Sequence, residues 1–203
     1  MTTASPTPRQ IARERGRSTG PAGHAQRALD LRHHDTVPAG EIVAREVRSP
    51  LGTLLLIGDG ARLRHLELPS SKRPLAIDPT WRRSSGAYPE VAEQLDRYFA
   101  GSLREFSLAL DLVGTPFQRR VWELLASIPF GATWTYGELA RRVGNPTASR
   151  AVGAANGRNP IPIILPCHRV IGSDGSLVGF GGGLDAKRRL LELEASACQP
   201  GLF

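Results

Sequence analysis

The segment IPIILPCHRVI occupies residues 161–171, and the rest of the chain is best interpreted from it. An apolar run leads into Pro166, and then Cys167, His168 and Arg169 stand together before the chain becomes apolar again. A thiol placed there is shielded from bulk water but has an imidazole and a cation close by, a setting that can make it a nucleophile. The same pattern fits a buried structural cysteine at the end of a strand, so both interpretations stay open on this segment alone.

The adjacency of Cys167 and His168 restricts the chemistry. Successive side chains on an extended strand point to opposite faces, which argues against a direct contact between thiol and imidazole. Pro166 fixes its own φ angle and holds Leu165 extended, a constraint that can re-aim the next residue. We therefore expect either a bend in the backbone at Cys167 or a water molecule that bridges the two side chains.

Composition limits the class of protein. The 203 residues, 40% of them hydrophobic, suffice for one large or two small domains. A net charge of +7 and a pI of about 10.4 favour a polyanionic partner such as nucleic acid. No apolar run could span a bilayer, and the N-terminus does not resemble a secretory signal. Two cysteines make no disulfide framework and no Cys/His cluster indicates zinc, so we expect a cytoplasmic protein without metal or cofactor.

Three regions differ in their patterns. Residues 1–37 hold arginines among Ser, Thr, Pro and Gly and predict a disordered basic tail. Residues 38–114 predict an α+β domain, a small antiparallel sheet with one helix, because β-like runs at 42–47, 53–57 and 63–68 precede a helix from Pro89 and a last strand near 106–112. We find no obvious chemistry in this domain and expect it to be a scaffold.

Residues 115–203 predict a mainly helical second domain. Thr115-Pro116 is a typical helix start, and Thr135 with Glu138 makes a capping-box pattern. A turn at Asn145-Pro146 separates the second helix from a third at about 147–157. This is the order of a helix-turn-helix, whose last helix enters a groove of DNA.

The third helix has the wrong side chains for reading a base sequence. Arg150 stands among Ala148, Ala151, Gly153 and Ala154, which allow close approach to DNA but cannot discriminate base pairs. We expect contacts to phosphates and to DNA shape, supported by nearby arginines; an Ala-rich packing helix is the alternative. Those arginines are Arg141, Arg142, Arg158 and Arg169.

A Gly-rich loop and a final helix complete the domain. The loop at 172–183 contains Phe180, whose ring could stack on a flat ligand. The helix at 184–197 places Leu190 and Glu194 near one side.

These motifs resemble a known family. PCHRV at 166–170, preceded by NPIP at 159–162 and RAVG at 150–153, is similar to the signature of the O6-alkylguanine-DNA alkyltransferases, also called methylated-DNA-protein-cysteine methyltransferases. The resemblance runs from about Glu41 to Ala197 and implies a winged-helix-like second domain. It implies DNA repair by irreversible, stoichiometric transfer of an alkyl group to Cys167 from O6-alkylguanine in duplex DNA, and also from O4-alkylthymine, after base flipping.

The resemblance also implies roles for single residues. It implies one hydrogen-bonded network that runs from Cys167 through a water to the His168 imidazole and the Glu194 carboxylate. In this network His168 acts as the base and Glu194 orients it. Tyr136 bonds the purine ring and contacts a phosphate, Arg150 fills the gap left by the flipped nucleotide, and Asn159 braces the active-site turn. Further DNA contacts are expected from Ala148, Ala151, Gly153, Ala154 and Arg158, and a pocket for the alkylguanine from Phe180, Val170, Gly181 and Pro162.

Phe180 departs from the tyrosine that is common at its position in the family, which puts its contact role in doubt. The thioether product has no regenerating nucleophile in the sequence, so we expect one alkyl group per chain, with Cys198 idle. A monomer is our default. The rival functions are a sensor of the same fold, a helix-turn-helix regulator and a cysteine hydrolase. Relatives that act as sensors replace the cysteine, the third helix is poorly equipped for a regulator, and adjacency of Cys167 and His168 disfavours a hydrolase.

Overall fold

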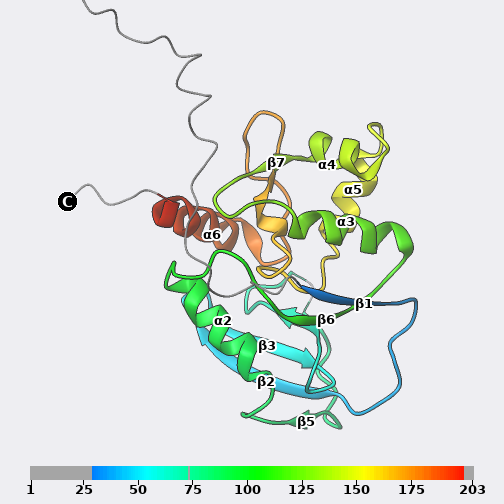
Figure 1. The fold of residues 1–203 in the computed structure, drawn as a ribbon, viewed down its shortest axis with the longest axis vertical. Helices are drawn as coiled ribbons and strands as arrows, with labels where there is room; N and C mark the ends of the chain where they lie inside the picture. Colours follow the sequence, from blue (N-terminus) through cyan, green and yellow to red (C-terminus); the bar gives the residue numbers. More distant parts are fainter. Residues whose placement is uncertain (1–28, 73, 199–203) are drawn as a thin grey trace, which may run out of the picture.

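The computed structural model describes residues 29–72 and 74–198 (Figure 1). The first part contains the strands β1 (Asp30–His34), β2 (Val43–Ser49), β3 (Gly52–Gly58), β4 (Leu63–Glu67), β5 (Arg82–Arg83) and β6 (Ala109–Val113), and the helix α2 (Pro89–Phe99). The second part contains α3 (Pro116–Ala126), β7 (Trp134–Thr135), α4 (Tyr136–Val143), α5 (Ser149–Asn156), the 3-10 turn η1 (Cys167–Arg169), β8 (Val170–Ile171) and α6 (Gly183–Cys198). None of these described helices is long and apolar enough to cross a membrane.

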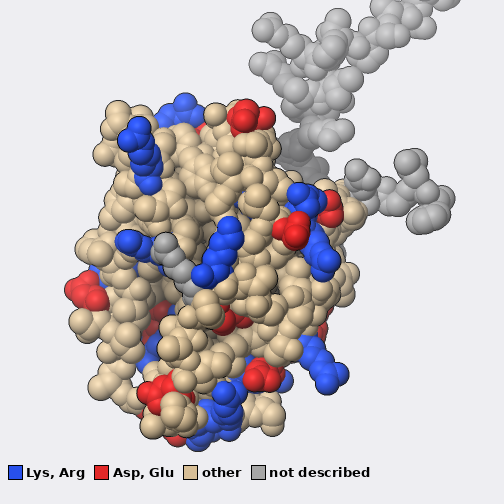
Figure 2. All heavy atoms as spheres, turned by 180° about the vertical axis from the view of Figure 1, so that it is seen from behind, with Lys and Arg blue, Asp and Glu red and all other residues tan. Residues whose placement is uncertain are grey.

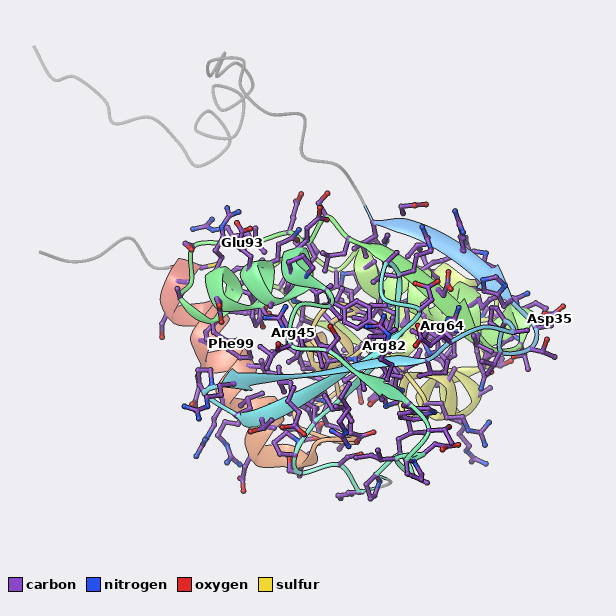
Figure 3. The ribbon with its side chains drawn as sticks, turned by 90° about the horizontal axis from the view of Figure 1, so that it is seen from below. Asp35, Arg45, Arg64, Arg82, Glu93 and Phe99 are labelled. Atoms are coloured by element: carbon purple, nitrogen blue, oxygen red, sulfur yellow. The ribbon has the colours of Figure 1, made fainter. Side chains whose placement is uncertain are left out.

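The first part is built on a mixed sheet with the strand order β1-β6-β4-β3-β2-β5. The predicted antiparallel meander is present as β2, β3 and β4. The prediction of a wholly antiparallel sheet is wrong, because β6 runs parallel to β4 and to β1, and β5 runs parallel to β2. The long connection through α2 brings the chain back to the same end of the sheet before β6 begins, which is what a parallel pair needs. Figure 3 shows α2 lying along one side of β2 and β3.

Strand β1 corrects the predicted tail. Residues 30–34 were assigned to a disordered segment ending at residue 37, but they pair with 109–113 of β6. The buried Arg62 guanidinium holds the strand, since it donates to Asp30 Oδ2 at 2.6 Å and to Asp111 Oδ1 at 2.8 Å. The rest of the predicted tail, residues 1–28, lies outside the described residues.

The predicted helix starts of the second part are confirmed. The Thr115 hydroxyl accepts from Gln118 N, and Thr135 with Glu138 forms a reciprocal capping box at the start of α4. Gly144 ends α4 with a φ of 94°, a left-handed conformation that suits glycine. The Trp122 indole of α3 donates to Ala155 O at 2.9 Å and so fixes α5, the third helix, against α3.

The two parts share one apolar core. Buried residues from the sheet, α2, α3, α4, α5 and the segment before Cys167 belong to a single packed cluster. A backbone hydrogen bond of 2.9 Å joins Leu66 N of β4 to Pro160 O, directly beside the Cys167 segment. The sheet therefore supports the segment that carries the thiol.

Candidate active site

Cys167 lies at the start of a tight turn, so the backbone bends here, which was one of the two expectations from its adjacency to His168. After Pro166 the backbone forms the 3-10 turn η1, so Cys167 and His168 are not on an extended strand. The segment before it is strained, because the buried, β-branched Ile163 has a φ of 74°. Asn159 holds this segment: its Nδ2 donates to Leu165 O at 2.7 Å, and its Oδ1 accepts from Ile161 N at 3.0 Å.

His168 and Glu194 form a completely buried pair. His168 Nε2 lies 2.8 Å from Glu194 Oε1 of α6, and neither side chain is exposed. Because an ionised carboxylate can only accept, Nε2 carries the proton and Nδ1 is the basic nitrogen. Nδ1 is buried and has no hydrogen-bond partner among the described residues.

Glu194 receives more donors than the one predicted. Arg169 Nε donates to Oε2 at 2.9 Å and Nη2 donates to Oε1 at 2.9 Å, while Gly131 N donates to Oε2 at 3.0 Å. The Tyr98 hydroxyl of α2 donates to Oε1 at 2.7 Å. The prediction that Arg169 supports the DNA-facing helix is therefore wrong: its guanidinium is buried and neutralises Glu194.

The protonation states follow from burial and charge. Burial raises the pKa of the Cys167 thiol to about 11, although the Asn159 side chain and the Lys187 charge oppose this. Burial also lowers the pKa of His168, against the pull of Glu194. Burial alone would raise the pKa of Glu194, but hydrogen bonds from His168 and Arg169 outweigh it and lower the pKa to about 2. At neutral pH the site thus holds a thiol, a neutral imidazole and a carboxylate.

Lys187 is a second cation beside the thiol. It is fully buried in α6, and its Nζ donates to Val170 O at 2.6 Å and to Val178 O at 2.7 Å. Burial lowers the pKa of Lys187 to about 8, and the charge of Cys167 acts in the opposite direction. The ammonium group ties α6 to β8 and to the middle of the Gly-rich loop.

Cys167 faces a cavity of about 620 Å³. Of the predicted pocket residues, Phe180, Gly181 and Pro162 line it, whereas the prediction for Val170 is wrong: its side chain is fully buried, and it does not line the cavity. The other wall comes from the first domain, which sequence reasoning treated as a scaffold without a site. That wall consists of His65, Leu66, Glu67, Leu68, Ser71 and Lys72.

The Gly-rich loop is held by the same wall. Lys72 N donates to Gly181 O at 3.0 Å, and the Ser70 hydroxyl donates to Gly182 O at 2.5 Å. Gly182 is so close to Leu68 that an added Cβ would lie 2.4 Å from Leu68 Cδ1. Phe180 is buried in the loop, with its ring 6.5 Å from that of His168.

Tyr136 lies where the Gly-rich loop meets α5. Its hydroxyl donates to Val178 O at 3.3 Å and accepts from Asn156 Nδ2 at 3.5 Å. Burial raises the pKa of Tyr136, so this phenol keeps its proton and can act as a hydrogen-bond donor. It does not line the cavity in the present arrangement.

Helix α5 presents small side chains and one arginine to solvent. Arg150, Ala151 and Ala154 of α5 are exposed, as is Arg158 two residues after the helix, whereas Ala148 and Gly153 are half-buried. Ala154 and Arg158 also line the cavity, so the exposed face of α5 continues into it. Figure 2 shows basic side chains spread over the back of the molecule, with smaller acidic groups between them.

Sequence reasoning missed Tyr98 and Lys187, although both left a signal. Tyr98 falls on the apolar face of its helix, where a buried phenol needs a polar partner. Lys187 stands three residues before Leu190 and seven before Glu194, a spacing that places all three on one face of a helix. In residues 29–72 and 74–198 no group of three or more His, Cys, Asp or Glu residues could hold a metal ion.

A helix-turn-helix beside a buried cysteine, histidine and glutamate defines the class of protein. The model of the 6-O-methylguanine DNA methyltransferase DNA-binding domain matches residues 116–196, and that of the ribonuclease-like domain of the same methyltransferase matches residues 42–112. The chain belongs to the O6-methylguanine-DNA methyltransferase family.

Individual relatives agree with this. A methylated-DNA–protein-cysteine methyltransferase of Mycobacterium leprae is 53% identical over 154 residues, which cover 75% of this chain and 92% of the relative. One from Methanosarcina acetivorans is 49% identical over 148 residues, which cover 73% of this chain and 95% of the relative. The crystal structure of Mycobacterium tuberculosis OGT in complex with DNA has a TM-score of 0.72 at 50% identity and covers 76% of this chain and 94% of that one.

Proposed function

We propose that the protein repairs O6-alkylguanine in DNA by transferring the alkyl group to the Cys167 thiol. The observation that carries the proposal is the position of Cys167, at the wall of a cavity and directly beside the buried His168–Glu194 pair. Family membership supports the same reaction, and a relative bound to DNA supports the partner.

The first step is removal of the thiol proton. Because burial keeps the pKa of Cys167 high, a resting thiolate is not formed and a base must act during the reaction. His168 Nδ1 is the base, reached through one bridging water, since Nε2 is committed to Glu194. Glu194 stabilises the imidazolium that results, as the carboxylate does in other histidine–carboxylate pairs.

The second step is displacement at the alkyl carbon. A lone pair of Cys167 Sγ forms the S–C bond, the C–O6 bond breaks, and its electron pair moves into the guanine ring. A proton from water neutralises the ring, and the hydroxide that remains takes the proton that His168 accepted from the thiol. The Tyr136 phenol donates a hydrogen bond to the ring and helps to stabilise the departing base. A thioether offers no leaving group to water, so each chain reacts once.

Access to the cavity requires the damaged nucleotide to leave the duplex. Cys167 is only 4% exposed, so a base stacked in DNA cannot reach it and must be flipped into the cavity. Arg150 extends from the second position of α5 and fills the gap in the duplex, while the small residues Ala151 and Ala154 let the helix approach closely. A flipped O4-alkylthymine, which is smaller than the guanine, is accommodated in the same way.

Intact-protein mass spectrometry after incubation with duplex DNA that contains O6-methylguanine tests the proposal. We expect one added methyl group in the wild type and in Cys198→Ser, and none in Cys167→Ser. If no variant gains a methyl group but the damaged duplex binds more tightly than undamaged DNA, the protein is a sensor and the proposal is wrong.

A further inference from the structure

The first domain sends one side chain into the buried pair of the second domain. Tyr98 of α2 is fully buried, and its ring packs against Phe99, Phe106 and Phe130 with centroids 5.4, 5.4 and 6.0 Å away. These contacts place its hydroxyl 2.7 Å from Glu194 Oε1 and 3.5 Å from His168 Nε2.

The direction of this hydrogen bond is fixed by the charges. Burial and the neighbouring Glu194 charge raise the pKa of Tyr98 well above its ordinary value, so the phenol keeps its proton. Glu194 is ionised and can only accept. Tyr98, His168 and Arg169 Nη2 therefore donate to the same oxygen, Oε1, and share its negative charge.

We propose that Tyr98 is a positioning residue that acts through Glu194: its hydroxyl holds Oε1 against His168 and weakens the attraction of the carboxylate for an imidazolium. His168 then stays neutral in the resting protein and is available as a base when the thiol loses its proton. This rests on the proposed function, since the base is needed only for alkyl transfer to Cys167.

The charged groups around His168 make the effect of one hydroxyl measurable. The titratable and charged groups that face it are Cys167 and Arg169 from η1, Lys187 and Glu194 from α6, and Tyr98 from α2. The change Tyr98→Phe removes one donor and leaves the other groups in place. Without that donor, the negative charge on Glu194 Oε1 is less neutralised and attracts a positive charge on His168 more strongly. This favours the protonated imidazole and raises the pKa of His168.

The test is the pH dependence, from pH 5 to pH 9, of single-turnover methyl transfer from O6-methylguanine DNA to the full chain, with the protein saturated by DNA. The rate falls on the acid side as His168 becomes protonated, and we expect Tyr98→Phe to move the midpoint of this fall upward by roughly 0.5 to 1 pH unit. The matched control is Tyr88→Phe, because Tyr88 is also buried in this domain but its hydroxyl donates to Val43 O. This control loses a buried hydroxyl and should keep the wild-type midpoint.

Each outcome decides something. An unchanged midpoint in Tyr98→Phe, or an equal shift in Tyr88→Phe, overturns the positioning role. A wild type that transfers no methyl group overturns the proposed function instead. Should Tyr98→Phe not fold, histidine nitrogen NMR of the wild type, assigned with His168→Gln, remains decisive: a neutral His168 imidazole at pH 7 is expected, and an imidazolium at that pH refutes the proposal.

Discussion

The contact between the Gly-rich loop and the first domain predicts opposite outcomes for two adjacent glycines. An alanine Cβ at Gly182 would lie 2.4 Å from Leu68 Cδ1 and 3.0 Å from Phe180 Cε1, whereas at Gly181 nothing lies within 4 Å. Neither glycine has a positive φ, so the two substitutions differ in space and not in backbone strain. Gly182→Ala must push Leu68 or the loop away, and Gly181→Ala need not move anything.

The size of the effect follows from overpacking. Leu68 is buried and cannot swing into solvent without giving up its packing. Overfilling a packed site costs about 1 to 3 kcal/mol. For a chain of this length 1 kcal/mol shifts the melting temperature by roughly 2 to 4 °C, so Gly182→Ala should lower it by roughly 2 to 12 °C. Gly181→Ala should stay within about 2 °C of the wild type, as surface changes do.

Thermal unfolding of both variants measures the difference, and Leu68→Ala combined with Gly182→Ala tests its cause. Shortening Leu68 leaves room for the new methyl group. The double variant should therefore lose less unfolding free energy than the two single variants lose together, by about 0.5 to 3 kcal/mol. Equal melting temperatures for Gly181→Ala and Gly182→Ala, or strictly additive losses, would refute the reasoning.

Three further changes test other parts of the site. Between pH 4.5 and pH 2 the unfolded state binds more protons at Glu194 than the folded state, whose pKa is about 2, so stability present above pH 4.5 is lost on acidification. Between pH 5 and pH 3 the loss is on the order of 2 kcal/mol, and it should be largely absent from Glu194→Gln in urea unfolding at these two pH values. Lys187→Ala removes the ammonium donor of the buried Val170 O and one of the two donors of Val178 O, which keeps the Tyr136 hydroxyl, and should cost roughly 1 to 3 kcal/mol by the same assay. A cost well below about 1 kcal/mol would contradict the assigned contacts. Arg150→Ala should weaken the binding of damaged and undamaged duplexes less than it slows methyl transfer, because Arg150 is proposed to hold the flipped state. If the fold loss in affinity, measured by titration, equals the fold loss in single-turnover rate, that role is excluded.

Local patterns predicted the helices well because their signals are local. Thr115-Pro116, the Thr135–Glu138 capping box and Gly144 each fix one helix end through contacts within a few residues. The position of Glu194 beside His168 could be expected from the family signature, and the structure supplies the distance. The bend at Cys167 was one of two alternatives that the adjacency left open.

The features that the sequence did not reveal depend on contacts between distant residues. β1 has no alternating pattern and is held by Arg62, 32 residues away from Asp30. Arg169 looked like a DNA contact because its partner Glu194 lies 25 residues further along the chain. The cavity wall from residues 65–72 and the contact of Tyr98 with α6 both arise from domain packing, which a single sequence without an alignment does not report.

The strand order of the sheet has a consequence for how the protein behaves at high concentration. Its two edges are β1 and β5, and an open edge can pair with the edge of another molecule and start aggregation. β1 carries Arg32, His33 and His34, and β5 has only two residues, both arginines. Charge and short length are the devices that block such pairing, so the sheet is protected from edge-to-edge association at both ends.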